Sequence, residues 1–385
     1  MRVLFLNYEY PPLGGGAANA TEYLLKEYAL TEDIEVDLIT SSPTDDFSLL
    51  HLSDRIRIHL LPIGKSSHNL HHQSQKDLLV YSFKAYQYAK KLLQEGSYDV
   101  IHAFFGVPCG VLAWHLGKKH HIPYIVSLRG SDVPGYSERF AFLYTFLRPP
   151  IRLVWQKAFR VVSNSRGLKE LALQSSPLQA VDIIPNGVDT RRFFPDVDKV
   201  PDDEWIITAG ATRLTARKGL HLIIEALPQL IHPTKKVIFE VMGDGASEEV
   251  LKQKAKKLGV ADRVRFLGRI PANETYQYYQ RASVFILPSA NEGMSNALLE
   301  ALASGLPALV TDTGGSSELV KEGENGIIME RTTEAIIGAL RFLLTHENER
   351  VIMGEKSRTR ALEQSWASVA HQYQVLYQAS QEKRI

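Results

Sequence analysis

The pattern that most constrains this 385-residue chain is an alternation of short apolar runs with longer amphipathic stretches. In residues 1–185 the apolar runs have the length of strands, and helical patterns such as 18–30 and 77–94 separate several of them. This order predicts a parallel sheet with right-handed crossovers and a ligand edge at the carboxyl ends of its strands. The predicted strands are Val3–Leu6, Val36–Thr40, Arg57–Leu61, Val100–Ala103, Tyr124–Ser127, Val161–Asn164 and Asp182–Ile184.

A second alternation begins at Trp205, after a segment rich in turn formers and charge (183–204) that reads as a linker. Its predicted strands are 206–211, 237–243, 264–268, 284–288 and 307–312, and its predicted helices include 220–230, 248–258 and 276–281. The sequence therefore predicts an α/β protein with two doubly wound Rossmann-like domains, 1–187 and 188–365, facing a cleft. Residues 366–385 are expected to form a helix that packs back toward the N-terminal domain.

Composition narrows the function classes. Hydrophobic residues make up 44% of the chain and charged residues 23%, which is typical of a globular protein. The net charge of +1 gives no general reason to expect a nucleic-acid partner. The single cysteine, Cys109, excludes an intrachain disulfide framework and fits a reducing compartment. The apolar run Val3–Leu6 is too short for a signal peptide, and no run approaches a membrane span, so a cytoplasmic location is expected.

The stretch from Pro288 to Pro307 has the strongest local signals for a site. A strand-like run ends in a proline, a small polar loop follows, and Ser295 or Asn296 can cap a helix rich in Ala and Leu. The start of such a helix presents unpaired backbone N–H groups and a partial positive charge, which favour phosphate. The alternative is a capped surface helix with solvated acids.

Two carboxylates accompany this predicted helix, Glu292 in the loop and Glu300 in the helix. Eight residues of continuous helix would turn them about 80° apart, so they are not expected to share one face. We expect Glu292 to reach over the mouth of the site and Glu300 to reach a ligand lying along the helix.

Two further loops suit an anion. Gly14–Gly16 follow the first predicted strand and precede a helix, and glycine lets backbone N–H groups approach a phosphate or sugar closely. The spacing is not that of a dinucleotide fingerprint, and a plain strand–helix turn is the alternative. In the second half, Arg213, Arg217 and Lys218 lie between a strand and a helix. Cations at the carboxyl end of a strand suit a diphosphate leaving group, whereas the alternative is a solvated basic loop.

Several other motifs are rejected. The GKSS sequence at Gly64 lacks the upstream glycine that a phosphate-binding P-loop requires, since His59 stands there. The cluster His68, His71 and His72 has no cysteine or acid at ligand spacing, so no metal site is expected. His102 is either a cleft residue or a hydrogen-bonded core histidine.

The segment Tyr136–Glu170 carries seven Lys or Arg against two Glu, with aromatic residues between them. Such a segment can contact an anionic membrane leaflet. The alternative is a pair of helices whose aromatic residues belong to the core and whose charges are solvated.

Seven motifs together resemble the retaining GT-B glycosyltransferases of family 4. They are GGG at Gly14, IPNGVD at Ile184, the loop of Arg213 and Lys218, GDG at Gly243, FLGRI at Phe266, EGMSNALLE at Glu292 and TDTGGSSELV at Thr311. The resemblance implies a metal-independent transferase without a cofactor. It would take a nucleotide-diphosphate sugar as co-substrate, bound mainly by the C-terminal domain. The acceptor would be a hydroxyl group of unknown type, and a lipid-linked acceptor would explain a membrane contact.

The resemblance also implies roles for single residues. Arg213 and Lys218 would hold the diphosphate, Glu300 the ribose hydroxyls, and Arg269 and Ile270 would border the base. Glu292 would hold the transferred sugar, together with the backbone N–H groups of Gly293, Met294, Ser295 and Asn296. Gly15 and Gly16 would approach the phosphates.

One position departs from the family pattern. Many relatives carry His-Gly in a loop where this chain has Arg129 within SLRGSD, and a guanidinium cannot act as a base near neutral pH. Arg129, Asp132 and His102 are therefore expected on the acceptor or sugar side. A sugar-nucleotide epimerase, a phosphorolytic enzyme and a non-catalytic nucleotide-sugar-binding protein are the alternative functions.

Overall fold

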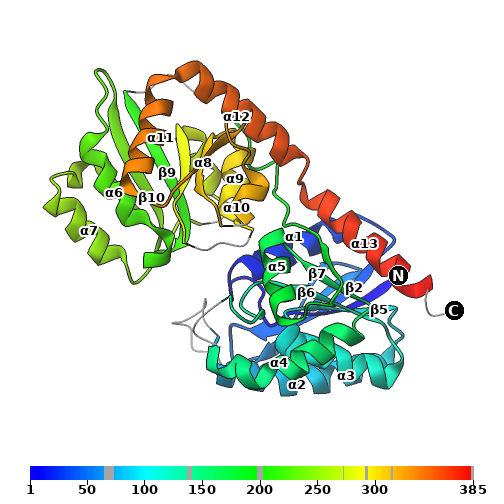
Figure 1. The fold of residues 1–385 in the computed structure, drawn as a ribbon. Helices are drawn as coiled ribbons and strands as arrows, with labels where there is room; N and C mark the ends of the chain where they lie inside the picture. The colour runs from blue at the N-terminus through cyan, green and yellow to red at the C-terminus, as the bar shows by residue number, and fades with distance from the viewer. Residues whose placement is uncertain are drawn as a thin grey trace. The chain divides into compact units, whose positions relative to one another are not determined.

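The computed structural model describes residues 1–64, 73–136, 141–196, 203–271, 273–290, 294–313 and 315–382. The chain divides into two compact units. Unit 1 comprises Met1–Asn186 and Trp366–Ile385, and unit 2 comprises Gly187–Ser365. Each unit contains one sheet flanked by helices (Figure 1), so the predicted α/β class with two parallel-sheet domains is confirmed.

The sheet of unit 1 has the strand order β3-β4-β2-β1-β5-β6-β7-β8. The strands are β1 (Arg2–Leu6), β2 (Glu35–Ser42), β3 (Ser48–Ser53), β4 (Ile56–Pro62), β5 (Val100–Phe104), β6 (Tyr124–Leu128), β7 (Arg160–Ser163) and β8 (Val181–Ile183). The prediction of a wholly parallel sheet is wrong at one edge, where β3 pairs antiparallel with β4. The leucines of β3 are exposed, so no buried apolar run marks this strand in the sequence.

Helices cover the sheet of unit 1. They are α1 (Gly16–Ala29), α2 (Gln75–Glu95), α3 (Val111–His120), α4 (Ala141–Lys157), α5 (Arg166–Ser175) and α13 (Trp366–Glu382), and a kinked turn at Gly106–Gly110 precedes α3. The predicted C-terminal helix is α13, which packs into the core of this unit through buried aromatic residues. Trp366, for example, stacks on Tyr23 of α1 with 5.3 Å between ring centroids.

The sheet of unit 2 has the order β11-β10-β9-β12-β13-β14, in which every pair is parallel. The strands are β9 (Glu204–Arg213), β10 (Lys236–Asp244), β11 (Val264–Gly268), β12 (Val284–Leu287), β13 (Ala308–Thr311) and β14 (Gly326–Met329). The predicted strands of this half end with the one at 307–312, and that end is wrong because β14 follows it. Its two isoleucines, Ile327 and Ile328, are only partly buried, so β14 lacks the wholly buried run of β12 and β13.

The helices of unit 2 agree with the predicted pattern and extend it. They are α6 (Leu220–Ala226), α7 (Glu248–Lys257), α8 (Thr275–Arg281), α9 (Asn296–Ala303), α10 (Gly315–Leu319), α11 (Thr333–Thr345) and α12 (Glu347–Leu362). The helix predicted at 220–230 is shorter than expected. Pro228 follows α6, and the chain continues there as a 3-10 turn, Leu227–Gln229.

The strand order of each sheet creates one position where ligands are expected. In unit 2, β9 lies between β10 and β12, and the chain runs outward on both sides of it. In unit 1, β1 has the same position between β2 and β5. In open α/β sheets the crevice at such a switch point, beyond the carboxyl ends of the strands, binds ligands.

Candidate functional site

The basic loop predicted in unit 2 lies at this switch point. Arg213 is the last residue of β9, and a 3-10 turn, Ala216–Lys218, follows it. The side chain of Arg213 is exposed and that of Lys218 is half-buried. Two cations therefore stand at the carboxyl end of the central strand, as the sequence predicted.

Backbone contacts fasten this loop to the segment that follows β12. The carbonyl oxygen of Arg217 accepts a hydrogen bond from the N–H of Ala290 at 2.9 Å. Gly219 has φ +70°, and a Cβ there would overlap the carbonyl oxygen of Pro288. Arg331 donates from Nε to the same Pro288 oxygen at 3.1 Å. The basic loop thus lies against the loop that leads into α9.

The start of α9 is capped as predicted. Ser295 is the N-cap, and its Oγ accepts a hydrogen bond from the N–H of Leu298 at 3.4 Å. Met294 and Ser295 are buried, whereas Asn296 is half-buried. Gly305 with φ +75° ends the helix in the left-handed region that glycine favours. Glu292 and Gly293 lie outside the described residues, so their predicted contacts with a sugar stay predictions.

Glu300 lies one turn into α9 and is partly buried. Its Oε2 accepts a hydrogen bond from the hydroxyl of Tyr279 in α8 at 3.1 Å. Burial raises the pKa of Glu300 to about 7, against the opposing effects of the Tyr279 hydrogen bond and the charge of Arg192. A carboxyl group with such a pKa exchanges its proton near neutral pH, which is frequent at functional sites. Tyr279 is a residue that the sequence reasoning missed.

Arg269 and Ile270 follow β11, whose carboxyl end lies at the same edge of the sheet. Arg269 is exposed, and Ile270 packs against the apolar cluster beneath α9. Their place is compatible with a border to a bound base, which stays a prediction.

In unit 1 the glycine loop joins β1 to α1. Gly15 is the N-cap of α1 and Gly16 its first residue, and both are exposed. The loop holds an acid that the sequence reasoning missed, because the N–H of Gly15 donates to Oε2 of Glu9 at 3.4 Å. A side chain at Gly14, which has φ +93°, would collide with the Glu9 carboxylate. The backbone of this loop thus accommodates one anionic group from the protein itself.

Arg129 follows β6 and is held by three groups of unit 1. Its Nη1 donates to Asn186 Oδ1 at 3.0 Å, and its Nη2 donates to the Tyr373 hydroxyl at 3.1 Å. The guanidinium carbon lies 3.5 Å from the centroid of the Phe104 ring. Burial lowers the pKa of Arg129 from its usual value. Arg129 therefore ties α13 to the sheet; its predicted contact with an acceptor is untested.

His102, in β5, is fully buried. Its Nδ1 is 2.6 Å from the Tyr377 hydroxyl and its Nε2 is 2.7 Å from Ser127 Oγ, and its ring stacks on Phe5. Burial lowers the pKa of His102 well below its ordinary value, so the ring is neutral at physiological pH. Of the two predicted alternatives, the structure matches the hydrogen-bonded core histidine.

Asp132 is also buried, and backbone donors engage both of its oxygens. Oδ2 accepts from the N–H of Gly106 at 2.8 Å, and Oδ1 accepts from those of Arg129 and Gly130 at 2.9 and 3.0 Å. Burial raises the pKa of Asp132, and the backbone hydrogen bonds oppose that shift. Asp132 thus joins the loops after β5 and β6, and its predicted contact with a substrate stays a prediction.

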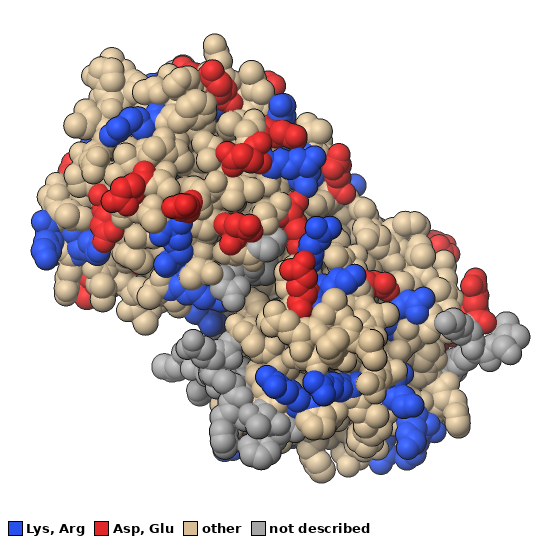
Figure 2. Space-filling model, in the orientation of Figure 1, with Lys and Arg blue, Asp and Glu red and all other residues tan. Residues whose placement is uncertain are grey.

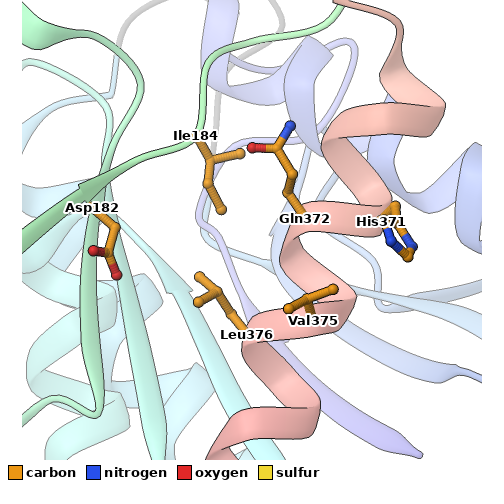
Figure 3. A pocket seen from close by; sticks show the side chains of 6 residues that line it. All are labelled: Asp182, Ile184, His371, Gln372, Val375 and Leu376. Atoms are coloured by element: carbon orange, nitrogen blue, oxygen red, sulfur yellow. The ribbon is translucent and has the colours of Figure 1, made fainter.

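Two hollows occur elsewhere in unit 1. One, of about 250 Å³, lies between β8 and α13, where Ile184 faces Val375 and Leu376 (Figure 3). The other, of about 630 Å³, lies between α3 and α4. No predicted site residue lines either of them, so neither is the candidate site.

Comparisons with known proteins decide the family. A sequence model of Glycosyl transferases group 1 matches residues 190–360, and one of Glycosyltransferase Family 4 matches residues 14–192. A GDP-mannose-dependent alpha-(1-6)-phosphatidylinositol monomannoside mannosyltransferase of Mycolicibacterium smegmatis is 30% identical over 289 residues, covering 70% of this chain and 73% of the relative. The chain belongs to the group 1 glycosyltransferases. This glycosyltransferase thus shares the family's reaction, the transfer of a sugar from a nucleotide sugar.

Solved structures show the same fold. Sucrose-phosphate synthase of Thermosynechococcus elongatus matches this glycosyltransferase with a TM-score of 0.84 at 22% identity, covering 98% of both chains. HepE of Anabaena, solved in complex with UDP and glucose, matches with a TM-score of 0.72 at 19% identity, covering 98% of this chain and 100% of the other. The predicted GT-B fold is confirmed.

Proposed function

We propose that this glycosyltransferase moves a sugar from a nucleoside diphosphate sugar to a hydroxyl acceptor, with retention of anomeric configuration and without a metal ion. The observation that carries this proposal is the fastening of the basic loop at Arg213–Lys218 to the segment leading into α9. It places two cations, a helix start and the carboxyl group of Glu300 at one edge of one sheet.

Each of these groups has a separate task in the proposed reaction. Arg213 and Lys218 stabilise the negative charge that develops on the departing diphosphate, because cations placed beforehand lower the barrier most where charge appears. Glu300 accepts hydrogen bonds from the ribose hydroxyls. Glu292 and the backbone N–H groups near Ser295 hold the transferred sugar.

Retention requires that the new bond forms on the face from which the old one departs. The bond between the anomeric carbon and the diphosphate oxygen breaks while the acceptor oxygen bonds to the same carbon. The acceptor proton passes to an oxygen of the departing diphosphate. The cations at Arg213 and Lys218 then carry the charge that a metal ion would otherwise neutralise.

A donor screen tests the proposal. The relative from Mycolicibacterium is named for GDP-mannose, and HepE was solved with UDP and glucose, so GDP- and UDP-sugars are the first candidates and ADP-sugars the third group. One donor class is expected to raise the melting temperature and to be hydrolysed slowly without an acceptor. Nuclear magnetic resonance of the product then reports its anomeric configuration, and inversion would contradict the proposal. Product analysis with and without acceptor or phosphate distinguishes this transferase from a phosphorolytic enzyme and from an epimerase.

A peripheral contact with an anionic membrane is the finer part of the proposal. Among the described residues, no helix is both long and apolar enough to cross a bilayer. Tyr144 and Trp155 in the predicted segment are buried, so they belong to the core. Arg148 and Lys157 of α4 are exposed, and Lys and Arg, without acids among them, line the visible surface of unit 1 where α4 lies (Figures 1 and 2).

This contact would therefore be electrostatic, at about 1 kcal/mol for each Lys or Arg near the leaflet. Reversing the charges of Arg148 and Lys157 to Glu is expected to abolish sedimentation with anionic vesicles at low salt. The same reversal at Lys256 and Lys257 of α7, which are also exposed, is the matched control. If wild-type protein does not sediment with anionic vesicles at low salt, a soluble acceptor is the better proposal.

A further inference from the structure

Tyr279 is the one neighbour that hydrogen-bonds the Glu300 side chain among the described residues. Its ring is buried between the rings of Phe193 and Phe285. The ring centroids are 5.9 Å apart for Phe193, in an edge-to-face arrangement, and 6.3 Å apart for Phe285. The hydroxyl donates to Glu300 Oε2 at 3.1 Å, and no side chain of the described residues donates to Oε1. The packing of the ring therefore fixes where one carboxylate oxygen lies and leaves the other for a ligand.

Two small residues make room for this hydroxyl. A Cβ at Gly210, near the end of β9, would overlap the Tyr279 hydroxyl and lie 2.9 Å from the Cβ of Ala297. Ala297 lies one turn before Glu300 on α9. The central strand, α8 and α9 thus meet at one point, where a larger residue at position 210 would displace the hydroxyl from Glu300.

We propose that Tyr279 is a positioning residue that holds the Glu300 carboxylate in the orientation and the ionised form that receive the two ribose hydroxyls of the donor. This inference rests on the proposed function of Glu300. An ionised carboxylate accepts through both oxygens, whereas a protonated one has to donate from one of them. The Tyr279 hydroxyl favours the ionised form because its hydrogen bond is stronger to a charged acceptor.

Among the described residues, one charged side chain acts on the pKa of Glu300. The charge of Arg192 lowers the pKa of Glu300. Arg358 of α12 instead donates to two carbonyl oxygens, that of Phe193 and that of Ala303, the last residue of α9. Burial keeps the pKa of Tyr279 well above its ordinary value, so its hydroxyl remains a donor from pH 6 to pH 9. Titration of Glu300 is therefore the event expected to govern donor binding in this range.

The test is calorimetry with the nucleotide sugar selected by the donor screen, because its esterified diphosphate does not titrate near neutral pH. In Tyr279→Phe the midpoint of the pH dependence is expected to rise by about one unit, since a hydrogen bond to a charged group is lost. Affinity should fall about fivefold at pH 7 and less than about twofold at pH 8.5. Tyr278→Phe, which removes a hydroxyl from the same helix, is the control. An equal loss at both pH values, or no loss at either, would overturn the inference.

Two further variants keep the outcomes distinct. Gly210→Ala retains the phenol but displaces it, so it should show the same loss at pH 7 and the same recovery at pH 8.5, even if Tyr279→Phe does not fold. Glu300→Gln should bind the donor weakly and without pH dependence. If Glu300→Gln binds as the wild type does, the proposed role of Glu300 is wrong. If it binds weakly while Tyr279→Phe behaves as the wild type, only the role of Tyr279 is wrong.

Discussion

Arg129 in unit 1 and Glu300 in unit 2 are both charged groups withdrawn from water near the carboxyl edge of a parallel sheet. The two terminal nitrogens of Arg129 donate to Asn186 and Tyr373, and its guanidinium lies on the face of Phe104, whereas its buried Nε has no hydrogen-bond partner among the described residues. The side chain of Glu300 accepts one hydrogen bond from the described residues, that of Tyr279. Burial shifts the pKa of each toward its neutral form, but only that of Glu300 moves to about 7.

This difference indicates that Arg129 stabilises the fold, whereas Glu300 can bind a ligand. The hydrogen bonds of Arg129 are made within unit 1, so its loss should be felt mainly as instability. Glu300 pays a desolvation cost that one hydrogen bond offsets only in part, and a ligand with two hydroxyls would offset more of it. The comparison therefore predicts that substitution of Arg129 in unit 1 lowers the free energy of unfolding. Substitution of the site residues in unit 2 should lower donor affinity and turnover instead.

The largest effect is expected at the cations of unit 2. Arg213→Ala and Lys218→Ala should each lower kcat by about 10²–10³-fold, because each removes a stabiliser of the departing diphosphate. Their melting temperatures should stay near that of the wild type, since Arg213 is exposed and Lys218 half-buried. Steady-state kinetics with the selected donor measures this, with Lys256→Ala of α7 as the control. Wild-type turnover in both variants would refute the assignment.

The next effect tests the other side of the comparison. Arg129→Met should lower the free energy of unfolding by about 2–3 kcal/mol, because it leaves Asn186 and Tyr373 without their charged donor. Urea denaturation followed by circular dichroism measures the loss, and Arg129→Lys, which keeps the charge without the planar fork, should recover part of it. If Arg129→Met is as stable as the wild type but inactive, Arg129 acts on substrate and the comparison fails.

Local sequence was enough to predict the parts of the site that lie within one stretch of chain. The cap at Ser295, the end of the helix at Gly305 and the place of Arg213 at the carboxyl end of a strand were correct, because each depends on neighbouring residues. Strand β3 was missed because its leucines are exposed, and β14 because its isoleucines are only partly buried.

Contacts between distant parts of the chain could not be predicted in this way. Arg129 meets Tyr373, which is 244 positions away, and nothing in SLRGSD indicates that a C-terminal helix supplies its partner. Tyr279 and Glu300 come from different helices and meet because Gly210 leaves the space. Alternation of hydrophobic residues predicts the two sheets, but not which polar side chains meet across them.

A smaller effect should follow from Glu300→Gln. The variant should bind the nucleotide sugar about tenfold more weakly at pH 8 and lose its pH dependence. Because folding raises the pKa of Glu300 from its usual 4.5 to about 7, this group favours the folded state below pH 4.5, and that contribution is lost as the pH rises through 7. Donor binding should strengthen over the same interval in the wild type. Calorimetry at several pH values measures both, and a pH-independent wild type would contradict the assignment.

The smallest expected effect is that of chelation. If Arg213 and Lys218 carry the charge of the departing diphosphate, then EDTA should leave kcat unchanged within error, because no step waits for a divalent cation. The informative measurement repeats this in Lys218→Ala, where one cation is missing. Added Mg²⁺ should raise the turnover of that variant more than that of the wild type, since the ion can then replace part of the lost charge. Strict dependence of the wild type on Mg²⁺ or Mn²⁺ would mean that the two side chains do not suffice to stabilise the departing diphosphate. A metal ion in unit 2 would then have to carry part of that charge.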